Sequence, residues 1–347
     1  MHRIGPPAAA IGTSVTAKHI HTYIICQYMQ PAWLGRSRPR SPIRAAALVD
    51  RQVAAQAAHR RAVRRPVGAR RLTGGRRFPV DARVRSCHDR AIMEGPRMSI
   101  TADTAPVPML TGPRHEEVLA ALHQLLTPRT YLEIGIEQGQ TLRAARCPSI
   151  AIDPVFSIDQ SIIGEKPECL LYRMPSDRFF DKHDPVTLLG EQLDLAFLDG
   201  LHLYEFLLRD FINVEACCRR NSVIVLHDCV PTDLYLARRD RQDESLRAQT
   251  RIPGGWCGDV WKTVLILRAY RPDLRIETFD SAYTGVVLVT NLDPESQVLT
   301  ERYVEAVESF AELSLQDYGL HRYIDELAMR DARSLFDPVQ LARYVWM

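Results

Sequence analysis

Two short segments of this 347-residue chain place carboxylate and imidazole side chains close together in the sequence. One apolar run ends at Asp199 and His202, and another ends at His227 and Asp228. Histidine exchanges protons near neutral pH, so we expect His202, and secondly His227, to act as a general base. Asp199 is expected to contact the cationic end of a ligand. An alternative is that Asp199 and Asp228 supply oxygen ligands to Mg²⁺.

A glycine-containing segment earlier in the chain has the composition of a ligand-binding turn. Glu133 and Gly135 lie within the apolar run 131–136, and Gly139 follows it. Glycines permit a tight strand-to-helix turn and close approach of a ligand, and the helix that we expect next has free N–H groups. The spacing lacks the three glycines of a dinucleotide-binding loop, and Glu133 would repel a pyrophosphate. A ligand that carries a cation is therefore favoured.

Three further polar residues follow the next two apolar runs. Asp153 ends the second run, where an acid accepts hydrogen bonds from a ribose diol in other nucleoside-binding sheets. Ser176 and Asp177 follow the third run, where a side chain reaches an adenine edge. The Asp-Pro dipeptide at 153–154 also favours a simple turn. In combination with the glycine segment, we expect all three side chains to contact a cofactor.

These residues end apolar runs that predict the strands of one sheet. The runs span 131–136, 149–153, 169–174, 194–199 and 222–227. Strands that are apolar throughout are buried on both faces, as in a parallel sheet, and the helical spacing between them predicts a doubly wound α/β fold. Only three residues separate two further strands, at 275–280 and 284–290, so one of these must be antiparallel to its neighbour. We expect seven strands, mostly parallel, with ligands at their carboxyl ends.

A polar insertion over 229–255 ends near two tryptophans. Trp256 and Trp261 lie beside glycines and form either the aromatic wall of a mobile lid or anchors of the next helix. Asp259 is expected to be the N-cap or a first-turn acid of that helix, which we place near 259–270.

Charge divides the chain into unlike parts. Residues 1–90 carry a net charge of +15, and the remainder carries −13. Residues 1–97 lack helix or strand periodicity, which is consistent with a disordered basic tail, an organelle transit peptide or an extension upstream of the true start. Residues 98–295 contain the α/β domain. Helical spacing over 296–347 predicts an extension that caps this domain or forms a homodimer surface.

Composition disfavours several classes of protein. No run reaches the ~18 apolar residues of a membrane span. The eight cysteines form no C-x-x-C pair and no zinc spacing, so we expect reduced thiols and a cytoplasmic location. The acidic charge of the globular part disfavours nucleic acid as a partner.

With these residues in place, residues 114–292 resemble class I S-adenosylmethionine-dependent methyltransferases. More narrowly, the chain is similar to the small-molecule O-methyltransferase branch in two elements. These are D-G-L-H-L-Y at 199–204 after the fourth strand and L-H-D at 226–228 after the fifth. The resemblance implies a Rossmann-like sheet ending in an antiparallel hairpin, with 98–295 as the methyltransferase domain. It also implies methyl transfer from S-adenosylmethionine to a hydroxyl of a sugar or secondary metabolite.

The resemblance assigns roles to the polar residues already described. It implies that Glu133, Gly135 and Gly139 hold the methionine part of the cofactor, and that Asp153 holds its ribose. Asp199 would lie near the methionine end, or near a divalent cation in metal-dependent relatives. Those relatives carry two adjacent acids after the fifth strand, where this chain has His-Asp at 227–228.

Three other functions compete with this one. An oxidoreductase that binds NAD or a nucleotide sugar uses a similar sheet, but the glycine spacing and Glu133 disfavour a pyrophosphate. A binding module would keep the cofactor and lack turnover. An Arg-rich arm would suit an RNA methyltransferase, which the acidic domain disfavours.

Overall fold

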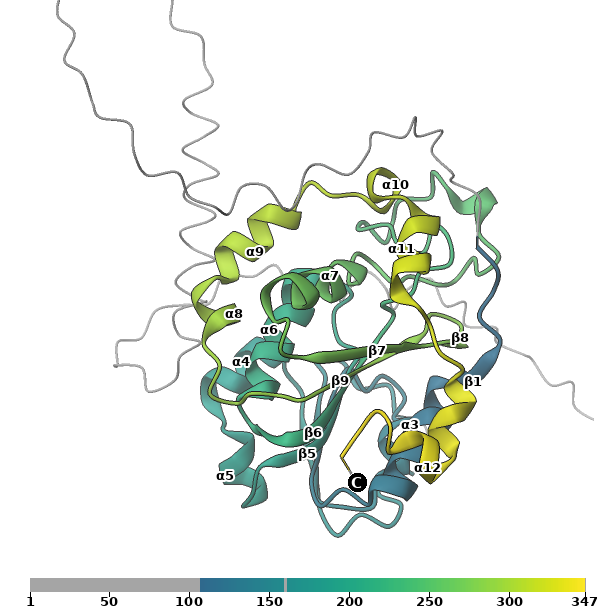
Figure 1. Ribbon diagram of the computed structural model, residues 1–347. Coiled ribbons are helices and arrows are strands. Elements are labelled where there is room, and N and C mark those ends of the chain that lie inside the picture. Colours follow the sequence, from purple (N-terminus) through teal and green to yellow (C-terminus); the bar gives the residue numbers. More distant parts are fainter. Residues whose placement is uncertain (1–106, 159–160, 347) are drawn as a thin grey trace, which may run out of the picture. The chain divides into compact units, whose positions relative to one another are not determined.

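The sheet holds seven strands in the order β4-β3-β2-β5-β6-β9-β7 (Figure 1). The computed structural model describes residues 107–158 and 161–346, and the basic segment 1–97 lies outside them. The strands are β2 (Tyr131–Ile134), β3 (Ser149–Ile152), β4 (Cys169–Tyr172), β5 (Leu193–Leu198), β6 (Cys218–His227), β7 (Arg275–Phe279) and β9 (Val286–Thr290). Pairing is parallel from β4 through to β6, and β9 is antiparallel to both of its neighbours. The predicted fold class is confirmed.

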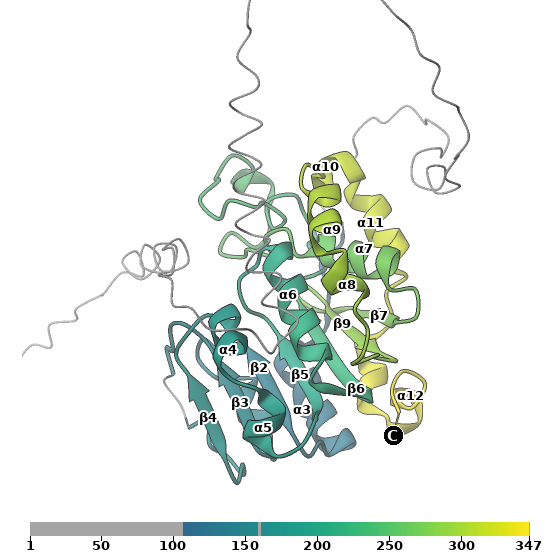
Figure 2. The same ribbon diagram turned by 90° about the vertical axis from the view of Figure 1, so that its left-hand side faces the viewer.

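Helices cover both faces of the sheet, which explains why its strands are apolar throughout (Figure 2). Along β6, Ile224 and Leu226 belong to one buried cluster, while Val223 and Val225 belong to another on the opposite face. The first face is covered by α4 (Ser176–Lys182), α5 (Pro185–Leu189), α6 (Tyr204–Glu215) and α7 (Trp261–Tyr270). The second is covered by α3 (His115–Leu126), η4 (Ala332–Phe336) and α12 (Pro338–Leu341).

The prediction of a helix after the glycine segment is wrong. Strand β2 is followed by one short 3₁₀ helix, η2 (Leu142–Ala144). Only eight residues separate Gly139 from Pro148, whose carbonyl already accepts a hydrogen bond from the backbone of Tyr131. That distance along the chain leaves no room for several helical turns before β3.

The last two sheet strands are joined through a small second sheet. Strands β7 and β9 are antiparallel, as predicted, but β9 begins at Val286 rather than at residue 284. Between them β8 (Ser281–Ala282) pairs in parallel with β1 (Gly112–Arg114). The Ser281 hydroxyl donates to the Pro113 carbonyl at 2.7 Å. This pairing fixes the residues that precede α3 against the end of the main sheet.

The C-terminal residues form short helices, in line with their helical spacing. These are α8 (Val298–Glu301), α9 (Tyr303–Phe310), α10 (Leu315–Tyr318) and α11 (Leu320–Leu327). The Tyr204 hydroxyl donates to the Val307 carbonyl at 2.8 Å, and the Tyr323 hydroxyl donates to the Cys229 carbonyl at 2.7 Å. Both bonds join these helices to the α/β domain.

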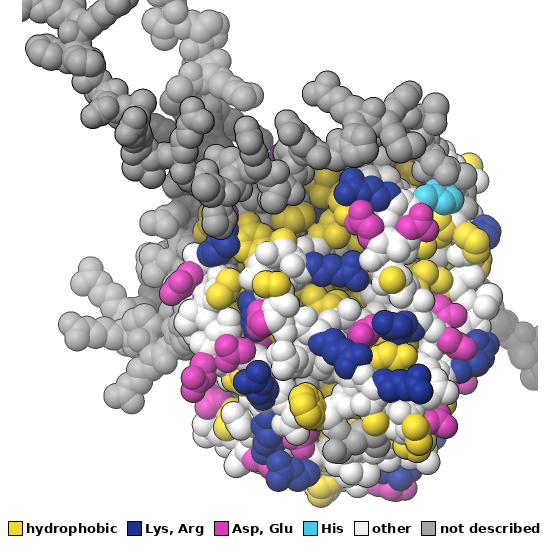
Figure 3. Space-filling model, viewed as in Figure 1, with side chains coloured by type: hydrophobic (Ala, Val, Ile, Leu, Met, Phe, Trp, Pro, Cys, Tyr) yellow, Lys and Arg dark blue, Asp and Glu magenta, His cyan; other side chains and the backbone are white. Residues whose placement is uncertain are grey.

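The surface of the described residues carries mixed charge. On the face in Figure 3, basic and acidic side chains are interspersed. Among residues 107–158 and 161–346, no helix combines the length and the apolar character that crossing a membrane requires.

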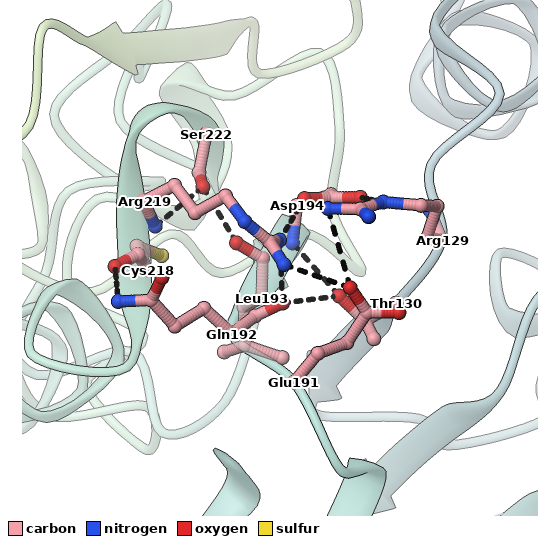
Figure 4. A network of polar contacts seen from close by, with 9 residues as sticks. All are labelled: Arg129, Thr130, Glu191, Gln192, Leu193, Asp194, Cys218, Arg219 and Ser222. Atoms are coloured by element: carbon pink, nitrogen blue, oxygen red, sulfur yellow. Dashed lines mark hydrogen bonds and ion pairs between the residues drawn. The ribbon is translucent and has the colours of Figure 1, made fainter.

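A polar network ties three strands together at the amino edge of the sheet, opposite the predicted ligand edge (Figure 4). Asp194 accepts a hydrogen bond from the backbone of Arg129 at 2.9 Å and pairs with the guanidinium of Arg219. The Thr130 hydroxyl donates to the Gln192 carbonyl at 2.8 Å. The polar groups at the starts of β2, β5 and β6 are therefore paired with one another, away from the predicted ligand edge.

Replacing Asp194 with alanine is expected to lower the free energy of unfolding by about 1–2 kcal/mol, because the backbone N–H of Arg129 loses its acceptor and the guanidinium of Arg219 loses one of its acceptors. Urea unfolding monitored by circular dichroism measures this change. The control, Arg302→Ala, removes an exposed pair with Glu305 and should cost less than about 0.5 kcal/mol. Equal losses in the two variants would contradict a structural role for the network.

Candidate active site

The four residues predicted to do chemistry lie together where β5 and β6 end. Nδ1 of His227 is 3.1 Å from Oδ1 of Asp199. Nε2 of His202 is 3.4 Å from the same oxygen, and Nδ1 of His202 is 3.2 Å from Oδ2 of Asp228. Because β5 and β6 are parallel neighbours, their carboxyl ends bring the two segments to one edge. The cluster can therefore accept a proton and stabilise the imidazolium that results.

The glycine segment packs directly against this cluster. Gly135 has φ +85°, and a Cβ built there would lie 1.9 Å from the carbonyl oxygen of Asp199. The backbone N–H of Asp199 donates to the Ile134 carbonyl at 2.8 Å. Only glycine permits both this conformation and this approach. Gly135 therefore sets the position of Asp199 through the backbone.

The residues directly after the insertion pack against His202. The ring of Trp256 stacks on the ring of His202, with centroids 5.2 Å apart, and the Trp256 carbonyl lies 2.5 Å from Nδ1. A Cβ at Gly258 would lie 1.7 Å from the carbonyl oxygen of His202. Trp261 is buried in the core against Tyr323. One tryptophan thus lines the site and the other anchors α7.

The contact with Trp256 determines which nitrogen of His202 carries a proton in the neutral ring. A carbonyl oxygen only accepts hydrogen bonds, so Nδ1 carries the hydrogen that it receives. The lone pair is then on Nε2, which faces Asp199. Nε2 is the nitrogen that can take a proton.

The charges of the aspartates dominate the protonation of both histidines. Burial lowers the pKa of His202, but Asp228 and Asp199 outweigh it and raise the pKa to about 9. Burial likewise lowers the pKa of His227, and Asp199 and Asp228 raise it to about 9. Burial raises the pKa of Asp199, yet the neighbouring imidazoles hold it below its usual value. The carboxylate of Asp199 thus favours the protonated form of both imidazoles.

A third histidine, which the sequence did not indicate, lies beside this cluster. The ring of His115, the first residue of α3, is 4.1 Å from that of His227, centroid to centroid. Burial, together with the charge of His227, lowers the pKa of His115 to about 4. His115 is therefore a neutral imidazole at physiological pH. No local pattern could identify it, because the β1–β8 pairing that places it joins segments 168 residues apart.

Asp153 reaches the glycine segment from the end of β3. Its Oδ2 accepts hydrogen bonds from the backbone N–H groups of Ile136 and Glu137, at 2.8 and 3.0 Å. Its Oδ1 accepts one from Val155 at 2.7 Å. A carboxylate has about four acceptor positions, so capacity remains for a ligand hydroxyl. The predicted ribose acceptor also fixes the loop.

Glu133 lies beneath the loop and is fully buried. The Tyr131 hydroxyl donates to Oε2 at 2.6 Å, and the Thr141 hydroxyl donates to Oε1. Burial raises the pKa of Glu133 to about 7 against the effect of these two bonds. Both oxygens therefore have partners within the protein.

Ser176 and Asp177 begin α4 at the same edge of the sheet. The carboxylate of Asp177 forms a two-point pair with Arg209, at 2.9 Å from Nε to Oδ1 and 2.8 Å from Nη2 to Oδ2. The Ser176 hydroxyl bonds to Asp210, whose pKa burial and the charge of Asp177 raise to about 7. The predicted adenine contacts are thus linked to buried groups of α6.

Asp259 does not cap its own helix as predicted. Its Oδ1 accepts a hydrogen bond from the backbone N–H of Tyr204, the first residue of α6, at 3.1 Å. Its Oδ2 pairs with Lys262 at 3.2 Å. Helix α7 begins at Trp261, with Val260 at its N-cap. The insertion is thereby tied to the start of α6, directly after His202. Within the insertion lies one short 3₁₀ helix, η3 (Arg247–Gln249).

The donors for a metal ion lie close together. One atom each from Asp199, His202 and Asp228 fall within 4.8 Å of one another. Two carboxylate oxygens and an imidazole nitrogen suit several divalent ions. Asp228 also has φ +57°, a conformation uncommon for residues other than glycine.

Comparison with known proteins finds a family match over part of the chain. A family model described as a methyltransferase domain matches residues 168–229, which include Asp199, His202, His227 and Asp228. None of the curated proteins matches the chain.

Solved structures similar to this chain include two named as O-methyltransferases, all at low identity. The enzyme TomG from Streptomyces achromogenes is 17% identical with a TM-score of 0.35, and the match covers 50% of this chain and 78% of that one. An O-methyltransferase from Bacillus cereus in complex with SAH is 15% identical with a TM-score of 0.36, over 53% and 83%. Cofactor-bound Rv0187 from MTB is 18% identical with a TM-score of 0.35, over 56% and 87%.

Proposed function

Residues 168–229 match a family model described as a methyltransferase domain, and from that premise we propose that this chain transfers a methyl group from S-adenosylmethionine to a hydroxyl of a small molecule. The observation that supports the proposal most is the position of Asp199, His202, His227 and Asp228 beside the glycine segment, at the carboxyl edge of a seven-stranded sheet. Cofactor loop and proton acceptor then belong to one site.

We propose that the glycine segment and Asp153 hold the cofactor. The Gly135–Gly139 backbone takes the methionine part, and Asp153 accepts hydrogen bonds from the ribose while it fixes the loop. Glu133 supports this loop from below. Ser176 and Asp177 lie toward the adenine, and Asp199 lies toward the sulfonium, whose positive charge its carboxylate stabilises.

We propose that His202 removes the proton from the acceptor hydroxyl through Nε2. The methyl group then passes in line from sulfur to oxygen, so that the C–S bond breaks as the C–O bond forms. The proton on His202 is stabilised by Asp199 and Asp228, which already raise its pKa. His227 is the second candidate for this role. An alcohol or sugar hydroxyl, with its high pKa, needs such a base more than a phenol does.

Two features of the chain are proposed from its composition. The described cysteines are all free, which supports reduced thiols and a cytoplasmic location. A homodimer formed through residues 296–347 stays a prediction.

The proposed function does not use Mg²⁺ at Asp199 and Asp228, because imidazole nitrogens already face both carboxylates.

Calorimetric titration of S-adenosylhomocysteine into the full chain tests the proposed function. Micromolar binding at one site is expected. Asp153→Ala should weaken it tenfold or more, about 1.4 kcal/mol, since both the ribose contact and the two loop bonds are lost. Asp184→Ala, which removes an N-cap at α5, is the matched control and should leave binding unchanged.

The result separates the candidate functions. Absence of binding to a folded chain would refute the cofactor assignment, and binding of NAD in its place would favour the oxidoreductase. Binding without methyl transfer to any acceptor would favour a module without turnover.

A further inference from the structure

The site contains two carboxylates and two imidazoles in mutual contact. The resemblance implies a second acid, in metal-dependent relatives, where this chain has His227. The exchange replaces a negatively charged oxygen ligand with a nitrogen that can carry a hydrogen and a positive charge. The contacts of His227 show how this exchange affects metal binding between Asp199 and Asp228.

We infer that the ring of His227, rather than a divalent cation, bridges Asp199 and Asp228. The inference rests on the proposed function for the identity of the site and adds how the two aspartates are held there.

Nδ1 of His227 lies between the carboxylates of Asp199 and Asp228, within ion-pair distance of both. It is 3.1 Å from Oδ1 of Asp199 and 3.7 Å from Oδ1 of Asp228. The other oxygen of Asp228 is 3.2 Å from Nδ1 of His202. Three of the four oxygens of the two aspartates therefore face an imidazole nitrogen. A metal ion bound between them would have to displace one of the rings.

Its neighbours prevent the ring of His227 from moving aside. The side chain is only 9% exposed. The ring of His115 lies 4.1 Å away and the ring of Phe197 lies 5.8 Å away, centroid to centroid. Nε2 lies 3.5 Å from the hydroxyl oxygen of Thr284. Because the side chain is packed on several sides, Nδ1 stays directed at the carboxylates.

A metal ion bound by Asp199, His202 and Asp228 would also compete with an imidazole. His202 would have to bind the metal through Nε2, because Nδ1 donates to the Trp256 carbonyl. That lone pair is the one with which His202 accepts a proton. A metal at this position would thus remove the base that the proposed transfer uses.

Manganese binding to the full chain tests this inference without any acceptor. Mn²⁺ is titrated in the presence of S-adenosylhomocysteine, and free Mn²⁺ is measured by electron paramagnetic resonance. The wild type should bind no Mn²⁺ below about 1 mM. His227→Glu restores an adjacent pair of acids and should bind Mn²⁺ at least tenfold more tightly than the wild type. His227→Gln, which removes the imidazole without adding an acid, is the matched control.

Each outcome decides the inference. It is supported if Mn²⁺ binds to His227→Glu and neither to the wild type nor to His227→Gln. It is overturned if the wild type binds one equivalent of Mn²⁺ and loses it in Asp199→Asn. It is also overturned if His227→Glu binds Mn²⁺ no better than His227→Gln while both still bind S-adenosylhomocysteine. Failure of the wild type to bind S-adenosylhomocysteine contradicts the proposed function instead, so the two failures are distinguishable.

Discussion

Replacing His202 with glutamine is expected to lower the rate of methyl transfer by about 10²–10⁴-fold. Glutamine has polar atoms of comparable reach but no group that accepts a proton near neutral pH. The affinity for S-adenosylhomocysteine should change by less than about threefold, because none of the proposed cofactor contacts is made by His202. The two readouts are tritium transfer from methyl-labelled S-adenosylmethionine to a panel of sugars, alcohols and phenols, and calorimetry.

The pH dependence of the same reaction identifies the base. The pKa of His202 is raised to about 9, and a base must first lose its proton. The wild-type kcat/KM, which reports groups of the free enzyme, should therefore rise between pH 7 and about 9. This rise should be absent from the residual activity of His202→Gln.

A matched control and a rival histidine make the test specific. His183 packs against Tyr172 and Phe179, apart from the cluster, and His183→Gln should retain both rate and pH profile. A wild-type kcat/KM that is flat above about pH 5, together with an active His202→Gln, would contradict His202 as the base. His115, with its pKa lowered to about 4, would then be the proton acceptor.

The sequence was sufficient to predict the sheet and the central cluster. In runs such as 131–134 and 222–227, successive residues point to opposite faces of the sheet. Most of them are apolar because helices cover both faces. Side chains that end neighbouring parallel strands must then meet at one edge. For that reason the sequence alone predicts that Asp199, His202 and the pair at 227–228 belong to one site.

Contacts between distant segments could not be predicted in this way. His115 reaches the cluster only because β1 pairs with β8, and a three-residue and a two-residue strand have no periodicity to detect. Trp256 could not be distinguished from Trp261, since both lie in the same glycine-containing segment. The partner of Asp177 is Arg209 on α6, and a sequence does not indicate which charges pair.

Replacing Gly135 with alanine is expected to have the second large effect. The new Cβ would lie 1.9 Å from the carbonyl oxygen of Asp199 and 2.9 Å from the backbone nitrogen of Gly200, so the backbone must move. The change should lower the free energy of unfolding by about 3 kcal/mol or more. It should also weaken S-adenosylhomocysteine binding at least tenfold, because loop and Asp199 are displaced together.

A second glycine separates the two causes of this effect. Gly190, the C-cap of α5, has φ +77°, similar to the +85° of Gly135, but a Cβ there meets nothing within 4 Å. Gly190→Ala should lower the free energy of unfolding by about 1–2 kcal/mol, because only the left-handed backbone conformation is unfavourable for alanine there. Cofactor binding should be unchanged. Thermal unfolding and calorimetry on both variants measure the difference. If the two variants lose the same stability and both bind cofactor normally, then close contact between the loop and Asp199 does not organise the site. A larger loss in Gly135→Ala alone means that cofactor loop and reacting cluster are positioned by one backbone contact.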